Sequence, residues 1–302
     1  MRKRKKKLHS LEHKPENIWI HLFFILVSLT YIIPFIYVIS ISFSAEDSIA
    51  QYGYTLFPKV FDAKAYEMIL ANPTQLINSY KVTILSSVLG TVIGVFLMAI
   101  VAYSISRREF RWRKQITFYI YFTMLFGGGL IPTYILCTQY LHIGNSFMIY
   151  MATGLLNAWY IIIIRTFFQG LPDSLVESAK LDGASEFKIF FFIVLPLSKP
   201  VIATISLFTV LNRWNDWNTS LIYIQDPKLY SLQYMLQRIL REAEFVKSLA
   251  SSGVNVTSAM KDAPTEAMRF AMAIIAAGPM LVVFPFFQKY FTKGLTVGAV
   301  KG

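Results

Sequence analysis

The feature that most constrains the fold is a run of uncharged residues between Lys114 and Arg165. Fifty consecutive residues there carry no Lys, Arg, Asp or Glu. At about 1.5 Å of rise per residue, a helix of that length far exceeds the ~30 Å hydrocarbon core of a bilayer. The run therefore predicts two membrane crossings joined by a turn. The polar residues expected to form the turn are Gln139, His142, Gly144 and Asn145.

The composition of the whole chain also indicates a membrane protein. Of its 302 residues, 55% are hydrophobic and only 15% are charged, whereas roughly 25% of the residues of an ordinary soluble domain are charged. A soluble fold could not cover so much apolar surface with so few charges, but lipid can face it. The single cysteine, Cys137, excludes an internal disulfide and a thiolate metal site built by this chain alone. The four histidines are scattered and predict no metal site.

The net charge of +12 raises the question of nucleic-acid binding. Six consecutive basic residues, at positions 2–7, come just before the first apolar segment. This placement favours contact with an anionic membrane surface. No basic face recurs with aromatic spacing on a soluble domain, so the sequence does not favour nucleic acid as a partner.

Six apolar segments predict an all-α membrane protein with six transmembrane helices. The predicted spans cover residues 18–45, 82–102, 116–139, 147–164, 201–224 and 270–287. In the second span, Gly90 and Gly94 are four residues apart and predict a close helix approach on one face. In the third, the glycines at 127–129 and then Pro132 predict a loosened or kinked helix.

The distribution of charge predicts that both termini lie in the cytoplasm. With six spans, the inner segments are the N-terminal tail, residues 104–115, residues 165–199 and the stretch after Phe287. These segments hold 19 Lys and Arg against 7 acidic residues, whereas the rest of the chain holds 10 of each. All of the excess positive charge therefore falls on the inner side, as the positive-inside rule requires.

The inner segment at residues 171–200 carries the most information about function. Pro172 and Asp173 resemble a helix start, Gly183 should end the helix, and an apolar run then ends at Pro196. The pattern predicts a short amphipathic helix, a turn and a second helix that returns to the membrane. Such a helix can dock a partner protein through its small and acidic residues. From the residues alone, it can equally lie on the lipid headgroups without a partner.

The same segment resembles the EAA loop of ABC importer permeases. That loop has Glu-Ala-Ala, a glycine four residues on, and then Ile-x-Leu-Pro. Here the matching residues are Glu177–Ser178–Ala179, Gly183 and Ile193–Val194–Leu195–Pro196, with Ser178 as the one departure. Residues 128–132, 165–168, 214–217 and 293–302 are similar to the carbohydrate-uptake branch of that family, which includes the maltose-permease type and the lipoprotein-dependent oligosaccharide importers.

The resemblance implies a type I ABC importer permease fold in a bacterial cell membrane. A basic cytoplasmic tail at residues 1–17 would precede one transmembrane permease domain at 18–302, with a coupling-helix loop at 171–200 and an outer loop, partly helical by its pattern, at 225–268. The implied partners are a second homologous permease, two ABC ATPase subunits, an extracellular sugar-binding lipoprotein and an oligosaccharide. This chain would bind no cofactor, since ATP and Mg²⁺ would bind to the ATPase.

The resemblance also assigns the segment after Pro172 as the helix that couples the permease to its ATPase. Glu177 is the carboxylate expected to pair with an Arg of the ATPase. The small residues Ala179, Gly183 and Ala184 are expected to let the partner surface come close. The full predicted coupling set is Asp173, Ser174, Glu177, Ser178, Ala179, Asp182, Gly183 and Ala184.

Polar and aromatic residues near the end of the fifth predicted span are candidates for the sugar pathway. They are Arg213, Trp214, Asn215, Asp216, Trp217 and Asn218. Charges inside a membrane usually face a cavity or a partner, and Trp214 and Trp217 are expected to share a helix face suited to sugar rings. The alternative is structural: Arg213 and Asp216, three residues apart, form an internal ion pair while the tryptophans anchor at the interface.

The sequence holds no nucleophile motif and no glycine-rich phosphate loop in the right context, so it does not predict an enzyme. An ion-coupled secondary transporter is the alternative function. Such transporters usually have more spans, inverted repeats and several carboxylates inside the membrane. Here Asp216 is the one acid that falls within a predicted span.

Overall fold

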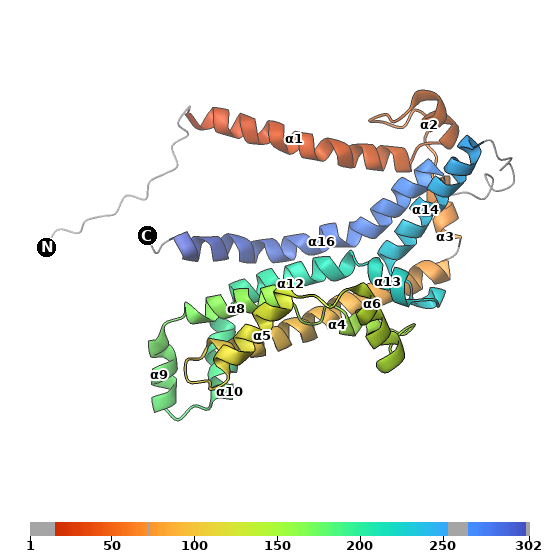
Figure 1. Ribbon diagram of the computed structural model, residues 1–302. Coiled ribbons are helices and arrows are strands. Elements are labelled where there is room, and N and C mark those ends of the chain that lie inside the picture. Colours follow the sequence, from red (N-terminus) through yellow and green to blue (C-terminus); the bar gives the residue numbers. More distant parts are fainter. Residues whose placement is uncertain (1–15, 72, 253–264, 300–302) are drawn as a thin grey trace. The chain divides into compact units, whose positions relative to one another are not determined.

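The computed structural model describes residues 16–71, 73–252 and 265–299, which fold into helices (Figure 1). The predicted basic tail at 1–17 lies outside the described residues apart from its last two positions. The longer helices are α1 (Glu16–Ser42), α4 (Pro73–Ser106), α5 (Arg113–Leu125), α8 (Ala158–Gln169), α12 (Lys199–Trp214), α14 (Leu232–Ser251) and α16 (Glu266–Ala299).

Shorter helices connect these elements. They are α2 (Glu46–Tyr52), α3 (Lys64–Leu70), α6 (Leu130–Ile135), η1 (Leu136–Tyr140), α7 (Met148–Ala152), α9 (Asp173–Leu181), α10 (Glu186–Ile189), η2 (Phe190–Val194), α11 (Leu195–Leu197), α13 (Asn218–Tyr223) and η3 (Pro227–Leu229). The pieces η1 and η2 are single π-helical turns, which often mark functional sites inside α-helices.

The chain forms two compact units, and the smaller one comprises residues up to Met68 together with Thr265–Ile274. Its buried apolar side chains include Ile41, Ile49 and Met272, and nearer the surface the ring of Phe43 stacks on those of Phe61 and Tyr66. The Glu46 carboxylate accepts hydrogen bonds from the backbone N–H groups of Glu266 (3.1 Å) and Ala267 (3.3 Å). This carboxylate therefore caps the start of α16, where the helix has unpaired N–H groups.

The larger unit comprises Ile69–Pro264 and the chain from Ile275 onward. Its centre is α4, which packs along α8 and α12 (Figure 1). Side chains that face this centre are fully buried, among them Met98, Ile105, Ile164, Ile189 and Ile205. Helices α9 and α10 lie at one end of this layer and α6 and α13 at the other end (Figure 1).

Three described helices are long and apolar enough to cross a membrane: α1, α4 and the first part of α16. Two bent pairs raise the number to as many as five if each pair counts as one span. One pair is α5 with α6 and η1, and the other is the segment Glu186–Leu197 with α12. The chain is thus a helical membrane protein, while the count of six spans stays a prediction.

The predicted third span is broken by its glycines, as the sequence indicated. Helix α5 ends at Leu125, α6 begins at Leu130, and the two axes differ by 113°. Gly129, the residue before α6, has a φ of +86°, which costs a glycine little but strains other residues. The interruption is larger than a kink.

The expectation of one continuous helix at 147–164 is wrong. Helix α7 ends at Ala152 and α8 begins at Ala158. Gly154 turns the chain with a φ of +66°, and the Asn157 side chain accepts a hydrogen bond from the N–H of Tyr160 at 3.2 Å. A side chain that caps a helix start in this way favours a new helix over continuation of the old one.

The predicted fifth span, 201–224, is also interrupted. Helix α12 ends at Trp214 and α13 begins at Asn218. The Asp216 carboxylate accepts a hydrogen bond from the N–H of Thr219 at 3.0 Å and so caps α13. The expectation that Trp214 and Trp217 share one helix face is therefore wrong. In the segment that the sequence places between the last two spans, the expected helix is present as α14.

Candidate functional site

The segment that resembles an EAA loop folds as the sequence predicts. Helix α9 begins after Pro172 and ends at Leu181, and Gly183 two residues later has a φ of +75°. The N–H of Gly183 donates to the carbonyl of Lys180 (3.0 Å), and the N–H of Ala184 donates to that of Ala179 (2.9 Å). Glycine in the left-handed region is the usual way to close a helix with these bonds. The second helix then starts at α10, where the Ser185 side chain accepts from the N–H of Lys188 at 3.4 Å.

Most of the predicted coupling residues are exposed on the surface of α9 and of the turn that follows it. Six of them are exposed: Asp173, Ser174, Glu177, Ser178, Asp182 and Gly183. Leu181, which the sequence analysis did not single out, is 90% exposed. A large apolar side chain left in solvent at a helix end suits a contact with another protein.

Two coupling residues differ from the expectation that they offer a small surface to a partner. Ala179 is buried and Ala184 is half-buried, and both pack against the core cluster beneath α9. Together with the buried Val176, they form the face of the loop that holds it on its own bundle. Their small size lets α9 approach this chain's other helices.

A network of charged and phenolic groups fixes α9 and α10 to the end of α4. Lys180 donates to Glu109 and, at 3.1 Å, to Glu186. Glu186 also accepts from the Tyr103 hydroxyl, and its carboxylate lies 4.0 Å from the Arg107 guanidinium. The hydrogen bonds to Glu109 and Glu186 raise the pKa of Lys180 above its ordinary value. We call these five residues the inner network.

Sequence reasoning missed the inner network, because residues 103–109 lie far in the sequence from α9 and α10 and only the folded chain brings them together. A charged cavity of about 420 Å³ lies beside it, and its lining includes Arg107, Arg108, Arg113, Asp173 and Glu177. Glu177 forms no ion pair with any residue that the structure describes. Its carboxylate is thus available to a cationic partner.

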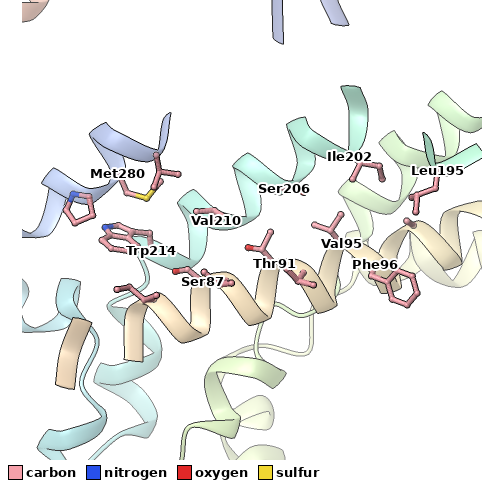
Figure 2. Close-up of a pocket in the computed structure, with 16 residues that line it drawn as sticks. Ser87, Thr91, Val95, Phe96, Leu195, Ile202, Ser206, Val210, Trp214 and Met280 are labelled. Carbon is pink, nitrogen blue, oxygen red and sulfur yellow. The ribbon is translucent and has the colours of Figure 1, made fainter. Parts of the chain in front are cut away.

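An apolar cavity lies between α4, α12 and α16 (Figure 2). It measures about 680 Å³, and Trp214 and Met280 lie at one end of it, with Phe96 and Leu195 at the other. The hydroxyls of Ser87 and Thr91, on its α4 side, have no hydrogen-bond partner in the described structure. An otherwise apolar wall cannot replace the hydration of a sugar, so this cavity does not suit a saccharide.

A second cavity, of about 280 Å³, is lined with polar groups. Besides Arg213 and Asp216, its walls include Asn157, Tyr160, Thr209, Asn212 and Thr219. The Asn212 amide donates to the Tyr160 hydroxyl at 3.0 Å, and the Tyr160 ring stacks on that of Phe208. Amides, hydroxyls and an aromatic ring are the groups that bind saccharides. Asn157, Tyr160 and Asn212 were missed in the sequence because single polar residues in apolar segments give a weak signal.

Arg213 holds the wall of this polar cavity together. Its guanidinium donates to the carbonyls of Tyr150 (2.7 Å) and Gly154 (3.2 Å) and lies against Gly90 of α4. It forms no ion pair with Asp216, whose carboxylate instead caps α13. The alternative of an internal ion pair between the two is therefore wrong. Arg213 joins α12 to the α7–α8 connection through carbonyl groups.

The remaining pathway candidates lie apart from the cavity. The Trp214 indole is buried and donates to the carbonyl of Ala276 at 2.9 Å. Asn215 accepts from the amide of Gln233 at 3.2 Å, the Arg241 guanidinium lies over the ring of Trp217, and Asn218 is exposed. Of the six predicted pathway residues, the structure brings only Arg213 and Asp216 together in the polar cavity.

Comparison with known proteins agrees with this architecture. The chain is 37% identical over 93% of its length, and 96% of the relative's, to the polygalacturonan/rhamnogalacturonan transport system permease protein YtcP of Bacillus subtilis. It is 40% identical over 90% of both chains to protein LplC of the same organism. A solved structure of a bacterial ABC transporter involved in the import of the acidic polysaccharide alginate matches with a TM-score of 0.76, 27% identity, and coverage of 95% of this chain and 100% of the other.

The family model described as the inner membrane component of binding-protein-dependent transport systems matches residues 90–297. That range includes α9, the inner network and the polar cavity. Because the matched residues make up more than half of the chain, they settle its class. The chain belongs to the family of inner membrane components of binding-protein-dependent transport systems, and it is a permease subunit of an ABC importer for sugars, not an enzyme.

Proposed function

We propose that this permease pairs with a second homologous permease and two ATPase subunits in a bacterial cytoplasmic membrane. An extracellular binding lipoprotein delivers an oligosaccharide to the pair. The observation that carries the proposal is the exposed face of α9, which offers Glu177 and Leu181 to a partner while its other face is packed on the bundle. ATP and Mg²⁺ bind to the ATPase subunits in this arrangement.

The inner network gives this docking helix a route into the membrane. Lys180 of α9 is bound to Glu186 of α10 and to Glu109 after α4, so a displacement of α9 also displaces these two residues. The same loop continues through η2 and α11 into α12, and α12 carries Arg213 to the wall of the polar cavity. Closure of the ATPase pair is thereby transmitted to the helices that line a saccharide pathway.

Reconstitution in liposomes tests the proposal against an ion-coupled transporter. The chain alone is expected to show no uptake under any imposed proton or sodium gradient. Together with the second permease, the ATPase and the binding protein, it is expected to import sugar only when ATP is supplied. Robust gradient-driven uptake by this chain alone would support the secondary transporter instead.

The substrate class to test first is an oligosaccharide that contains uronic acids. The support comes from two similar proteins, a polygalacturonan/rhamnogalacturonan transport permease and a transporter involved in the import of alginate. The polar cavity itself holds one guanidinium and one carboxylate. Its charge therefore favours neither acidic nor neutral oligosaccharides. Stimulation of ATP hydrolysis by oligogalacturonate, compared with maltodextrin, distinguishes acidic from neutral substrates.

We predict that Lys180→Met uncouples transport from ATP hydrolysis. The change removes both hydrogen bonds from Lys180 to the inner network, so α9 can move without pulling α10. Since Lys180 is partly exposed, we expect a loss of about threefold to tenfold in sugar imported per ATP hydrolysed. Lys188→Met, on the exposed side of α10, is the matched control and should keep the wild-type ratio.

A second prediction concerns the polar cavity. Asn212→Leu removes an amide that lines it and donates to Tyr160. We expect the KM of ATP-driven uptake to rise roughly tenfold, as one or two hydrogen bonds to the sugar are lost. Asn78→Leu, at a half-buried position of α4 outside the cavity lining, is the control. An unchanged KM in the Asn212 variant would remove the cavity from the pathway.

A further inference from the structure

The basic side chains beside the start of α5 surround another cavity, which shares Arg108, Glu109 and Arg113 with the charged cavity beside the inner network. The cavity measures about 780 Å³. Its lining contains five cationic residues and one acidic residue, which are Arg108, Arg111, Arg113, Lys114, Arg165 and Glu109. Arg165 comes from α8, whereas the others belong to α5 or the residues before it, and α5 packs against α8 (Figure 1).

The positive charge of this cavity is not neutralised within the described chain. Its one carboxylate, Glu109, is already bound by Lys180 of the inner network. None of the five cationic residues forms an ion pair with a described carboxylate. The first turn of α5 holds no acidic residue, and no side chain caps its start, so the helix dipole adds to the positive potential. Like charges gathered in one place favour a bound anion.

Two polar groups of the cavity lining have no hydrogen-bond partner. The Nε of Arg165 and the hydroxyl of Thr117 are shielded from solvent and form no hydrogen bond in the described structure. Both can donate, and buried donors are costly when they are left unpaired. Phosphate oxygens accept such bonds, and a guanidinium binds them in a bidentate way. The chemistry that the cavity would recognise is that of a phosphate ester.

The aromatic residues of the lining indicate that the anion carries an apolar tail. Phe118 and Tyr121 follow Arg113, Lys114 and Thr117 along α5 at helical spacing, on the same side of the helix. Phe118 is 70% exposed and Tyr121 is 44% exposed. The cavity is thus cationic at the start of α5 and apolar one to two turns farther along, which matches the headgroup and acyl chain of a lipid.

We propose that this cavity is a binding site for an anionic phospholipid of the inner leaflet. Basic pockets between transmembrane helices on the cytoplasmic side are suited to anionic headgroups. Arg113 and Arg165 hold the phosphate, Thr117 donates to it, and an acyl chain lies along Phe118 and Tyr121. The lipid thereby joins α5 to α8 and neutralises the charge beside the inner network. This site depends on the membrane location of the chain and not on the proposed substrate.

Lipid binding by the purified importer tests the site. Native mass spectrometry of the complex, titrated with phosphatidylglycerol or phosphatidylcholine, should show preferential retention of phosphatidylglycerol. Arg165→Gln should weaken that retention roughly fivefold, and Arg113→Gln with Arg165→Gln roughly 20- to 30-fold. Lys188→Gln, which removes a charge from the same side of the chain outside the cavity, should change it by less than about twofold.

Additional measurements distinguish a lipid headgroup from free phosphate and provide a second variant in case the arginine variants do not fold. Inorganic phosphate and glycerol phosphate at millimolar concentration should not displace phosphatidylglycerol, because they lack the acyl chain. Displacement by either would show a site for free phosphate and overturn the lipid assignment. If the arginine variants fail to assemble, Lys114→Gln, whose side chain is exposed, provides the test. Equal retention of the two lipids, or equal effects of cavity and control variants, would also overturn it.

Discussion

Gly183→Leu is expected to reduce sugar uptake to background while the protein still inserts into the membrane. Gly183 ends α9 with a φ of +75°, a conformation that costs a residue with a side chain roughly 1–2 kcal/mol. A Cβ at this position would meet nothing within 4 Å in the chain itself, so the leucine would project from the docking face. The change therefore alters both the end of α9 and the surface offered to the ATPase.

Gly183→Asn separates these two effects. Asparagine tolerates the left-handed region better than other residues that carry a side chain, so it restores the backbone but adds less bulk. We expect Gly183→Asn to keep most of the uptake and Gly183→Leu to lose ATPase subunits during purification of the complex. Normal uptake by Gly183→Leu would show that α9 is not the docking helix.

Gly94→Ala is expected to be the most destabilising single methyl addition in the larger unit. A Cβ at Gly94 would lie 2.7 Å from the carbonyl oxygen of Leu155, a backbone atom in the α7–α8 connection. Because that connection must shift as a whole, we expect a loss of about 1–3 kcal/mol in the free energy of unfolding. The thermal midpoint of the purified protein in detergent measures this loss.

Two glycines of the same chain serve as comparisons for Gly94→Ala. At Gly90 the added Cβ would lie 2.4 Å from the Arg213 guanidinium, the end of a flexible side chain. Gly90→Ala should therefore lower the free energy of unfolding by less than Gly94→Ala. The loss should come from disturbed hydrogen bonds between Arg213 and the carbonyls of Tyr150 and Gly154. At Gly278 nothing lies within 4 Å, so Gly278→Ala in α16 should leave the midpoint unchanged or raise it. An equal midpoint for all three variants would contradict the close approach.

The docking segment could be predicted from the sequence in detail because its signals are local. Pro172 and Gly183 bound α9 by backbone geometry alone, and Gly90 and Gly94 indicated the close approach that the structure places at Arg213 and Leu155. The glycines at 127–129 likewise predicted the interruption of the third span. Each of these predictions rests on residues that constrain their own backbone.

The breaks near Gly154 and Asp216 could not be predicted in the same way. Hydropathy continues across both, and each break depends on one polar side chain that caps the following helix, Asn157 or Asp216. The alternative of an ion pair between Arg213 and Asp216 assumed a continuous helix, but α12 ends at Trp214. The inner network and the polar cavity join residues far apart in the sequence, so only the packing of the helices reveals them.

Site-specific cross-linking tests most directly whether α9 docks on a separate ATPase subunit. The single cysteine, Cys137, is buried, so Ser178→Cys places one accessible thiol on the exposed face of α9. In the assembled importer, this thiol should cross-link to the ATPase subunit, and Ser252→Cys at the exposed end of α14 should not. Labelling of Ser178→Cys by a membrane-impermeant reagent from outside intact cells, with no cross-link to the ATPase, would contradict the account.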